Sequence, residues 1–173
     1  MTHDLIEQAK KYATWKHTGQ KRKYTGEDYI VHPTEVAATV ASLPDSTPEM
    51  IAAAYLHDVV EDTDTSVTDI LEEFGMVVAS YVNGLTDVSS PEHGNRACRK
   101  AKDREWLENQ CKEVQTIKMA DLISNSSSIF EYDKKFAKVY LKEVEQLHSV
   151  LTEADKGLSE KVRLILENYK NEL

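Results

Sequence analysis

A short segment that is apolar on every face constrains the fold of this chain more than any other feature. Residues 50–56 read MIAAAYL, and they follow Thr47-Pro48-Glu49, which offers a capping hydroxyl and a first-turn proline. A helix with apolar side chains all around has to be surrounded by other elements. We therefore expect a central, buried helix from Met50 to about Val60.

The rest of the chain carries helical periodicity, which only 6 Gly and 4 Pro among 173 residues interrupt. Pro33 marks one helix start, and Ser159 is expected to cap the last helix after a break at Gly157. Other helices are expected over residues 4–18, 67–74, 76–85, 97–109, 112–128 and 134–153. The pattern predicts a single all-α domain over residues 1–173, a helical bundle of about eight or nine helices.

The apolar positions of the helix over residues 134–153 give a direct test of this reading. They recur at helical spacing, so they should face the core together. The side chains expected to be buried there are Phe136, Val139, Tyr140, Val144, Leu147 and Leu151.

Charge and composition narrow the classes of function. The formal net charge of −9 argues against binding to nucleic acid through the phosphate backbone. No apolar run approaches the roughly 20 residues that span a bilayer, and the charged N-terminal segment does not resemble a signal peptide. Two cysteines, Cys98 and Cys111, form neither a disulfide framework nor a CxxC site. We expect a cytoplasmic protein that binds no membrane.

Ionisable residues follow the apolar segment at once. His57 and Asp58 are adjacent, and Glu61 and Asp62 lie one helical turn further on. Charges beside a core are costly unless they are paired or bound to a metal ion, and a divalent cation would relieve the repulsion among the three carboxylates. The alternative is a solvated helix end with no chemical role.

Two more residues complete a pattern of metal-ligand types. His32 sits at a loop-to-helix junction before Pro33, and Asp121 is flanked by apolar residues with Asn125 one turn on. Alone, His32 would be a capping or packed histidine and Asp121–Asn125 a buried hydrogen bond. Together with His57 and Asp58, they offer two imidazoles and two carboxylates. Such a set suits Mn²⁺, Zn²⁺ or Fe²⁺ and leaves positions for water and substrate.

Two basic clusters are candidate contacts for an anionic ligand. Lys21-Arg22-Lys23 precedes the His32 segment and could clamp a nucleotide, since arginine also stacks on bases. The second cluster could meet a pyrophosphate group or form an exposed helix face, and it comprises Arg96, Arg99, Lys100, Lys102 and Arg104.

Four sequence words carry a resemblance to a known family. They are HTGQ at 17–20, GEDYIVHP at 26–33, HDVVEDT at 57–63 and KMADLISN at 118–125. Their order and spacing resemble the HD superfamily, and within it the hydrolase domain of the RelA/SpoT alarmone enzymes and its small single-domain relatives. The pairing of HDVVEDT with the upstream YIVHP is specific, whereas a lone HD pair is weak.

The resemblance implies a site and a reaction. It implies Mn²⁺ on His32, His57, Asp58 and Asp121, and it implies that Glu61 and Asp62 position or deprotonate the attacking water and assist the leaving group. It further implies hydrolysis of a 3′-phosphate or 3′-pyrophosphate ester on a nucleotide. Candidate substrate contacts are Arg22 or Lys23 against the base, Asn125 near the ribose, and Ser128.

One departure from the family pattern keeps the substrate open. Leu122 stands where the alarmone enzymes have an arginine. The main reading is a hydrolase that converts ppGpp to GDP and pyrophosphate. One alternative is the same chemistry on another 2′- or 3′-phosphorylated nucleotide, such as NADPH. The other is a non-catalytic nucleotide sensor, whose signature would be loss of Glu61 or Asp62, and both are present.

Overall fold

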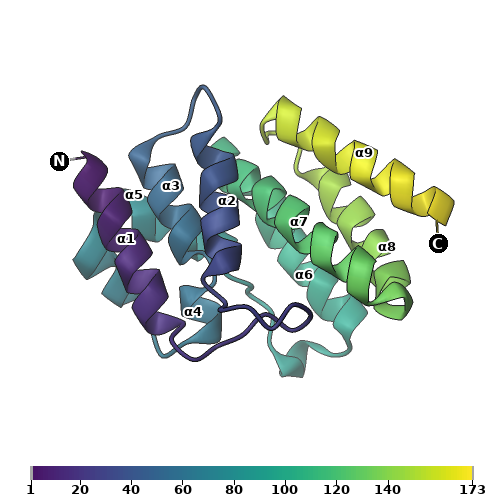
Figure 1. Ribbon diagram of the computed structural model, residues 1–173, viewed down its shortest axis with the longest axis horizontal. Coiled ribbons are helices and arrows are strands. Elements are labelled where there is room, and N and C mark those ends of the chain that lie inside the picture. The colour runs from purple at the N-terminus through teal and green to yellow at the C-terminus, as the bar shows by residue number, and fades with distance from the viewer. Residues whose placement is uncertain (1, 173) are drawn as a thin grey trace. The chain divides into compact units, whose positions relative to one another are not determined.

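The computed structural model describes residues 2–172, and these residues are predominantly helical (Figure 1). They form two compact units that meet in the sequence at Thr86 and Asp87. Apart from an isolated bridge between Lys21 and Asp28, the described part of the chain contains no β structure. The all-α prediction is confirmed, whereas the prediction of one domain over the chain stays a prediction.

The helices divide between the units as follows. The first unit holds α1 (Thr2–Lys16), α2 (Val31–Ala41), α3 (Pro48–Leu56), α4 (Val59–Asp62) and α5 (Val67–Leu85). The second holds the 3₁₀ turn η1 (Pro91–His93), α6 (Arg96–Glu108), α7 (Lys112–Tyr132), α8 (Lys134–Val150) and α9 (Lys156–Glu172). Over residues 2–172, the run from α1 to α9 agrees with the predicted eight or nine helices.

Helix α3 is the core of the first unit, as its sequence predicts. It packs against α1, α2 and α5, and Ala52, Ala53, Ala54 and Leu56 are completely buried. Thr47 caps its start, where the side chain accepts a hydrogen bond from the Met50 amide at 3.2 Å. The expected end near Val60 was wrong, because α3 stops at Leu56. A turn at His57 and Asp58 then leads into the short helix α4.

The predicted loop over residues 17–30 has more structure than its sequence indicates. The Arg22 amide donates to the Glu27 carbonyl at 2.9 Å, and Gly26 closes the turn with a positive φ of 73°. The Tyr29 amide donates to the Gln20 carbonyl at 3.0 Å. These bonds fold the segment back on itself and deliver Tyr29 beside the start of α2.

Helix α5 is interrupted at the glycine that the sequence singled out. Gly75 has φ 83° and ψ 173°, a conformation outside the helical region that is nearly exclusive to glycine. The two halves of α5 therefore correspond to the two helices expected over 67–74 and 76–85. Ser66 caps the first half through a reciprocal hydrogen-bond pair with Asp69.

In the second unit, α7 packs against α6, α8 and α9. Two expectations for this unit were wrong. The side chains expected to be buried on and just after α8 are so only in part: Val144 and Leu151 are buried, Val139 is 47% exposed, and the others, Phe136, Tyr140 and Leu147, are half-buried. Helix α9 begins at Lys156 and runs through Gly157, because Asp155 rather than Ser159 accepts a hydrogen bond from a first-turn amide, that of Leu158, at 2.9 Å.

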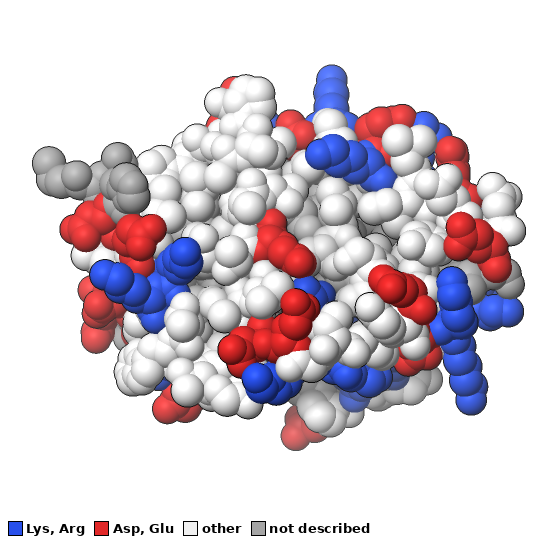
Figure 2. Space-filling model, in the orientation of Figure 1, with Lys and Arg blue, Asp and Glu red and all other residues white. Residues whose placement is uncertain are grey.

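Within residues 2–172, no helix combines the length and the apolar character that crossing a membrane requires. On the face drawn in Figure 2, lysine and arginine side chains are scattered among aspartate and glutamate side chains.

Candidate metal centre and anion pocket

Three of the four predicted metal ligands come together in the first unit. His32 lies in the first turn of α2, and His57 and Asp58 form the turn between α3 and α4. One ligand atom from each of the three lies within 4.8 Å of the other two. The His32 and His57 rings are buried, whereas Asp58 is partly exposed. The site is thus open on the carboxylate side.

The hydrogen bonds of His57 decide which ring nitrogen is available. Its Nδ1 lies 2.8 Å from the Ala54 carbonyl oxygen, which only accepts, so Nδ1 carries the hydrogen. In the neutral ring, Nε2 then holds a lone pair, 3.2 Å from His32 Nε2 and 3.0 Å from Asp58 Oδ2. A lone pair and a carboxylate at this distance need a positive charge among them, a proton or a metal ion. Two imidazoles and a carboxylate are a ligand set that a divalent ion takes.

Tyr29 supports this cluster and was not identified from the sequence. Its hydroxyl donates to Asp58 Oδ2 at 2.6 Å, and its ring contacts His32 with 5.9 Å between centroids. The residue lies in the YIVHP word, but nothing in that word separates a structural tyrosine from one that holds a ligand. Outer hydrogen bonds of this kind fix the orientation of metal ligands.

The two candidate catalytic carboxylates lie on α4, next to the cluster. Glu61 and Asp62 are both exposed. Desolvation of the Asp62 carboxyl and the nearby Asp58 carboxylate raise the pKa of Asp62. The Asp62 carbonyl accepts from Gln20 Nε2 at 2.9 Å, and Gln20 Oε1 in turn accepts from His17 Nδ1 at 2.8 Å. Residues of the HTGQ word therefore support the end of α4 through hydrogen bonds, a role that was not predicted from the sequence.

The two residues of the first loop that are candidates for contacting the nucleotide base, Arg22 and Lys23, interact with side chains of their own unit. Arg22 Nη1 lies 3.1 Å from Glu35 Oε2, and its side chain is only 10% exposed. Lys23 Nζ lies over the Tyr24 ring at 4.9 Å from its centroid. Neither contact tests a role toward substrate, so both assignments stay predictions.

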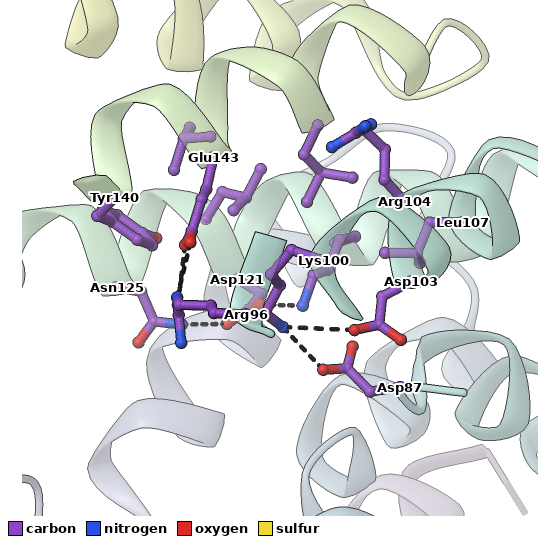
Figure 3. Close-up of a pocket in the computed structure, with 14 residues that line it drawn as sticks. Asp87, Arg96, Lys100, Asp103, Arg104, Leu107, Asp121, Asn125, Tyr140 and Glu143 are labelled. Carbon is purple, nitrogen blue, oxygen red and sulfur yellow. Dashed lines mark hydrogen bonds and ion pairs between the residues drawn. The ribbon is translucent and has the colours of Figure 1, made fainter. Parts of the chain in front are cut away.

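Asp121, the fourth predicted ligand, lies on α7 in the second unit. It is buried, and its carboxylate accepts from Lys118 Nζ at 2.8 Å and from Asn125 Nδ2 at 2.7 Å (Figure 3). The expectation that Asp121 is shielded from water and shares a face with Asn125 is confirmed. Ser128 Oγ donates to the Asn125 carbonyl at 3.2 Å. The roles of Asp121 as ligand and of Asn125 and Ser128 as substrate contacts stay predictions.

A pocket of about 180 Å³ opens beside Asp121. Its lining includes Asn125 and Leu122, the position at which the sequence departs from the family pattern. Part of the second basic cluster also lines it, namely Arg96, Lys100 and Arg104. Figure 3 shows Arg96 directed toward Glu143, and Lys100 directed toward Asp87 and Asp103. The cluster is therefore part of a pocket wall rather than only an exposed helix face.

Tyr140 also lines this pocket. Its hydroxyl is buried and makes no well-formed hydrogen bond among the described residues, although the neighbouring Ser126 side chain is close enough to lower its pKa. Burial and, to a lesser extent, the Asp121 carboxylate raise the pKa of Tyr140, so the phenol is a donor at neutral pH. A buried donor that lacks a well-formed hydrogen bond is uncommon in folded proteins and costs free energy.

Comparison with known proteins places the chain in a family. The family model for the HD domain matches residues 9–124. The chain belongs to the HD domain family. The match includes all four predicted metal ligands of this HD chain and contains residues from both units.

Two relatives and one solved structure that are similar to this chain are named for hydrolysis of guanosine-3′,5′-bis(diphosphate), ppGpp. It is 33% identical over 168 residues to guanosine-3′,5′-bis(diphosphate) 3′-pyrophosphohydrolase of Aquifex aeolicus, covering 97% of this chain but only 23% of that protein. It is 36% identical over 116 residues to the pyrophosphohydrolase MESH1 of Danio rerio, covering 66% of this chain and 63% of that protein. A solved structure of a metazoan ortholog of SpoT that hydrolyses ppGpp matches with a TM-score of 0.84 and 25% identity, over 95% of each chain. The chain thus spans about a quarter of the Aquifex relative.

Proposed function

We propose that this chain is a metal-dependent phosphohydrolase that removes the 3′-pyrophosphate of ppGpp and leaves GDP. The observation that carries the proposal is the convergence of His32 Nε2, His57 Nε2 and Asp58 Oδ2 within 4.8 Å, with the His57 lone pair turned toward the other two. The family match and the names of its relatives support the reaction and the substrate.

A divalent ion bound here, for which we propose Mn²⁺ ahead of Zn²⁺ or Fe²⁺, would supply positive charge that lowers the pKa of water and polarises a phosphate ester. The chain's own residues hold and tune that site. His32, His57 and Asp58 would bind the ion, and Tyr29 fixes the Asp58 carboxylate. Asp121 remains the proposed fourth ligand on the strength of its sequence word.

Glu61 and Asp62 are the proposed proton-handling residues. Both carboxylates are exposed on α4, one turn after Asp58, so water reaches them. Desolvation and the nearby Asp58 carboxylate raise the pKa of Asp62, which is the direction that suits a group that accepts and returns a proton. Proton removal from the attacking water and donation to the leaving oxygen are the two transfers that this hydrolysis requires.

The pocket in the second unit suits the anionic part of a nucleotide. Arg96 and Lys100 line it, and the buried Tyr140 hydroxyl offers a further donor. Leu122 also lines it, where the alarmone enzymes carry an arginine. That substitution is the specific observation that keeps a second candidate, the 2′-phosphate of NADPH, in consideration.

The proposal is tested by offering ppGpp and NADPH side by side to the purified chain with Mn²⁺ and identifying the products. Pyrophosphate and GDP from ppGpp, with NADPH untouched, are the expected result. Phosphate from NADPH without turnover of ppGpp would mean that NADPH, not ppGpp, is the substrate. The proposed metal-dependent phosphohydrolase chemistry would still hold. Binding of ppGpp without any product would identify a nucleotide sensor instead. Repeating the assay with Zn²⁺ and Fe²⁺ ranks the metals.

A further inference from the structure

Arg96 is held by a carboxylate of its own protein in the geometry that a phosphate group takes. Its Nε lies 2.7 Å from Glu143 Oε1 and its Nη2 lies 2.8 Å from Glu143 Oε2 (Figure 3). Two parallel N–H···O bonds of this kind are how a guanidinium recognises either a carboxylate or a phosphate. Glu143 thus occupies the face of Arg96 that an anionic ligand would use.

The charges that line the pocket balance one another. Four cations, Arg96, Lys100, Arg104 and Lys118, are matched by four carboxylates, Asp87, Asp103, Asp121 and Glu143. An anion that enters therefore gains little from bulk charge, and it gains most where it replaces a carboxylate on a cation. The Glu143 side chain is only 19% exposed, so its charge is screened by water less than that of a surface residue.

The buried Tyr140 hydroxyl is an independent indication that a polar ligand belongs in this pocket. It makes no well-formed hydrogen bond among the described residues, with only the Ser126 side chain nearby, and it lies on α8 one turn before Glu143. A ligand oxygen would satisfy the phenol, whereas Glu143 already has its partner in Arg96. The pocket therefore contains one donor, Tyr140, whose hydrogen bonding a ligand oxygen would complete, and another, Arg96, that a carboxylate already binds.

We propose that Glu143 is a specificity-determining residue that competes with the ligand's phosphate for Arg96. A ligand with a doubly charged phosphate or pyrophosphate group displaces the carboxylate, and a weaker anion does not. Glu143 thus sets a threshold of charge for entry and lowers the affinity for every anion. This inference rests on the proposed function in one respect, that the pocket receives the phosphates of the substrate.

The experiment measures binding of inorganic pyrophosphate to the full chain by isothermal titration calorimetry, without substrate or added metal. Glu143→Gln keeps the size of the side chain and removes its charge. We expect pyrophosphate to bind this variant about two- to fivefold more tightly, the range for a partly exposed ion pair that no longer competes. Glu143→Ala is the second variant in case the glutamine still holds Arg96.

The matched control is Glu160→Gln. Glu160 pairs with Arg163 on α9, outside the pocket, through the same kind of guanidinium–carboxylate contact. Its loss should leave pyrophosphate binding unchanged. In a protein that already carries Arg96→Gln, Glu143→Gln should increase the affinity for pyrophosphate much less than it does in the native chain. Damage to the fold would weaken binding, so a gain in affinity cannot come from it.

The outcomes separate this inference from the proposed function. Equal or weaker pyrophosphate binding by folded Glu143→Gln and Glu143→Ala overturns the role of Glu143, as does a failure of pyrophosphate to bind any of the proteins. Turnover of ppGpp is measured in parallel on the native chain. If Glu143→Gln binds pyrophosphate more tightly while the native chain hydrolyses no ppGpp, the competition stands and the proposed substrate falls.

Discussion

Replacement of Tyr29 by phenylalanine isolates one hydrogen bond of the proposed metal centre. The hydroxyl donates to Asp58 Oδ2 at 2.6 Å, a length typical of a bond to a charged acceptor. Tyr29→Phe keeps the ring that contacts His17 and His32 and removes only this donor. The carboxylate would then lose the partner that fixes its orientation.

The magnitude follows from the charge on the acceptor. A hydrogen bond to a charged group contributes about 1.5–3 kcal/mol, which corresponds to roughly a 10- to 100-fold change in an equilibrium constant. Loss of partners that orient metal ligands lowers metal affinity over the same range, about 10- to 100-fold. We therefore expect Mn²⁺ to bind Tyr29→Phe about 10- to 100-fold more weakly than the native chain.

The assay is calorimetric titration of Mn²⁺ into chelator-treated protein, with thermal unfolding followed in parallel. Tyr24→Phe is the control, because Tyr24 lies in the same loop and its hydroxyl accepts from Lys23 Nζ at 3.3 Å, away from the ligands. It should bind Mn²⁺ like the native chain. An Mn²⁺ affinity of Tyr29→Phe within about twofold of the native value would mean that Tyr29 does not orient a metal ligand.

Four other substitutions test the core, the kink, the catalytic carboxylate and the fourth ligand. Leu56→Ala removes a completely buried side chain of α3 and should lower the free energy of unfolding by about 2–5 kcal/mol in denaturant titrations. Gly75→Ala should also destabilise, by about 1–3 kcal/mol, because φ 83° and ψ 173° strain any residue with a Cβ; a gain in stability would mean that this backbone relaxes. Glu61→Gln should retain Mn²⁺ affinity in calorimetry and lose turnover by about 100-fold or more, and unchanged turnover would remove Glu61 from the reaction. Asp121→Asn should abolish both Mn²⁺ binding and turnover with little change in the thermal melt, and a variant that keeps both would exclude Asp121 as a ligand.

The sequence was informative where one local pattern dominates. The apolar run over 50–56 has no stable place except a core, and α3 is buried among α1, α2 and α5. The glycine at 75 and the polar stretch over 17–30 were visible as interruptions for the same local reason. His32, His57 and Asp58 were also identified from their words, and the structure brings them together.

What the sequence could not supply were contacts between distant residues. Arg96 and Glu143 lie 47 positions apart, and the pairing depends on how α6 packs on α8. Tyr29 and Asp58 lie 29 positions apart, so the hydrogen bond between them leaves no periodic signal. The helix over 50–60 was predicted too long because helix-favouring residues continue past Leu56. In the structure the His57 ring donates a hydrogen bond to the Ala54 carbonyl, and the helix ends there.

The most direct test of the proposed metal centre is pyrophosphate release from ppGpp by chelator-treated protein before and after Mn²⁺ is restored, with His57→Asn measured alongside. A metal centre on these ligands predicts no release without metal, release after Mn²⁺ is added, and none at any Mn²⁺ concentration from a folded His57→Asn variant. Release by the chelated native chain, or undiminished release by His57→Asn, would contradict a metal centre built on His32, His57 and Asp58.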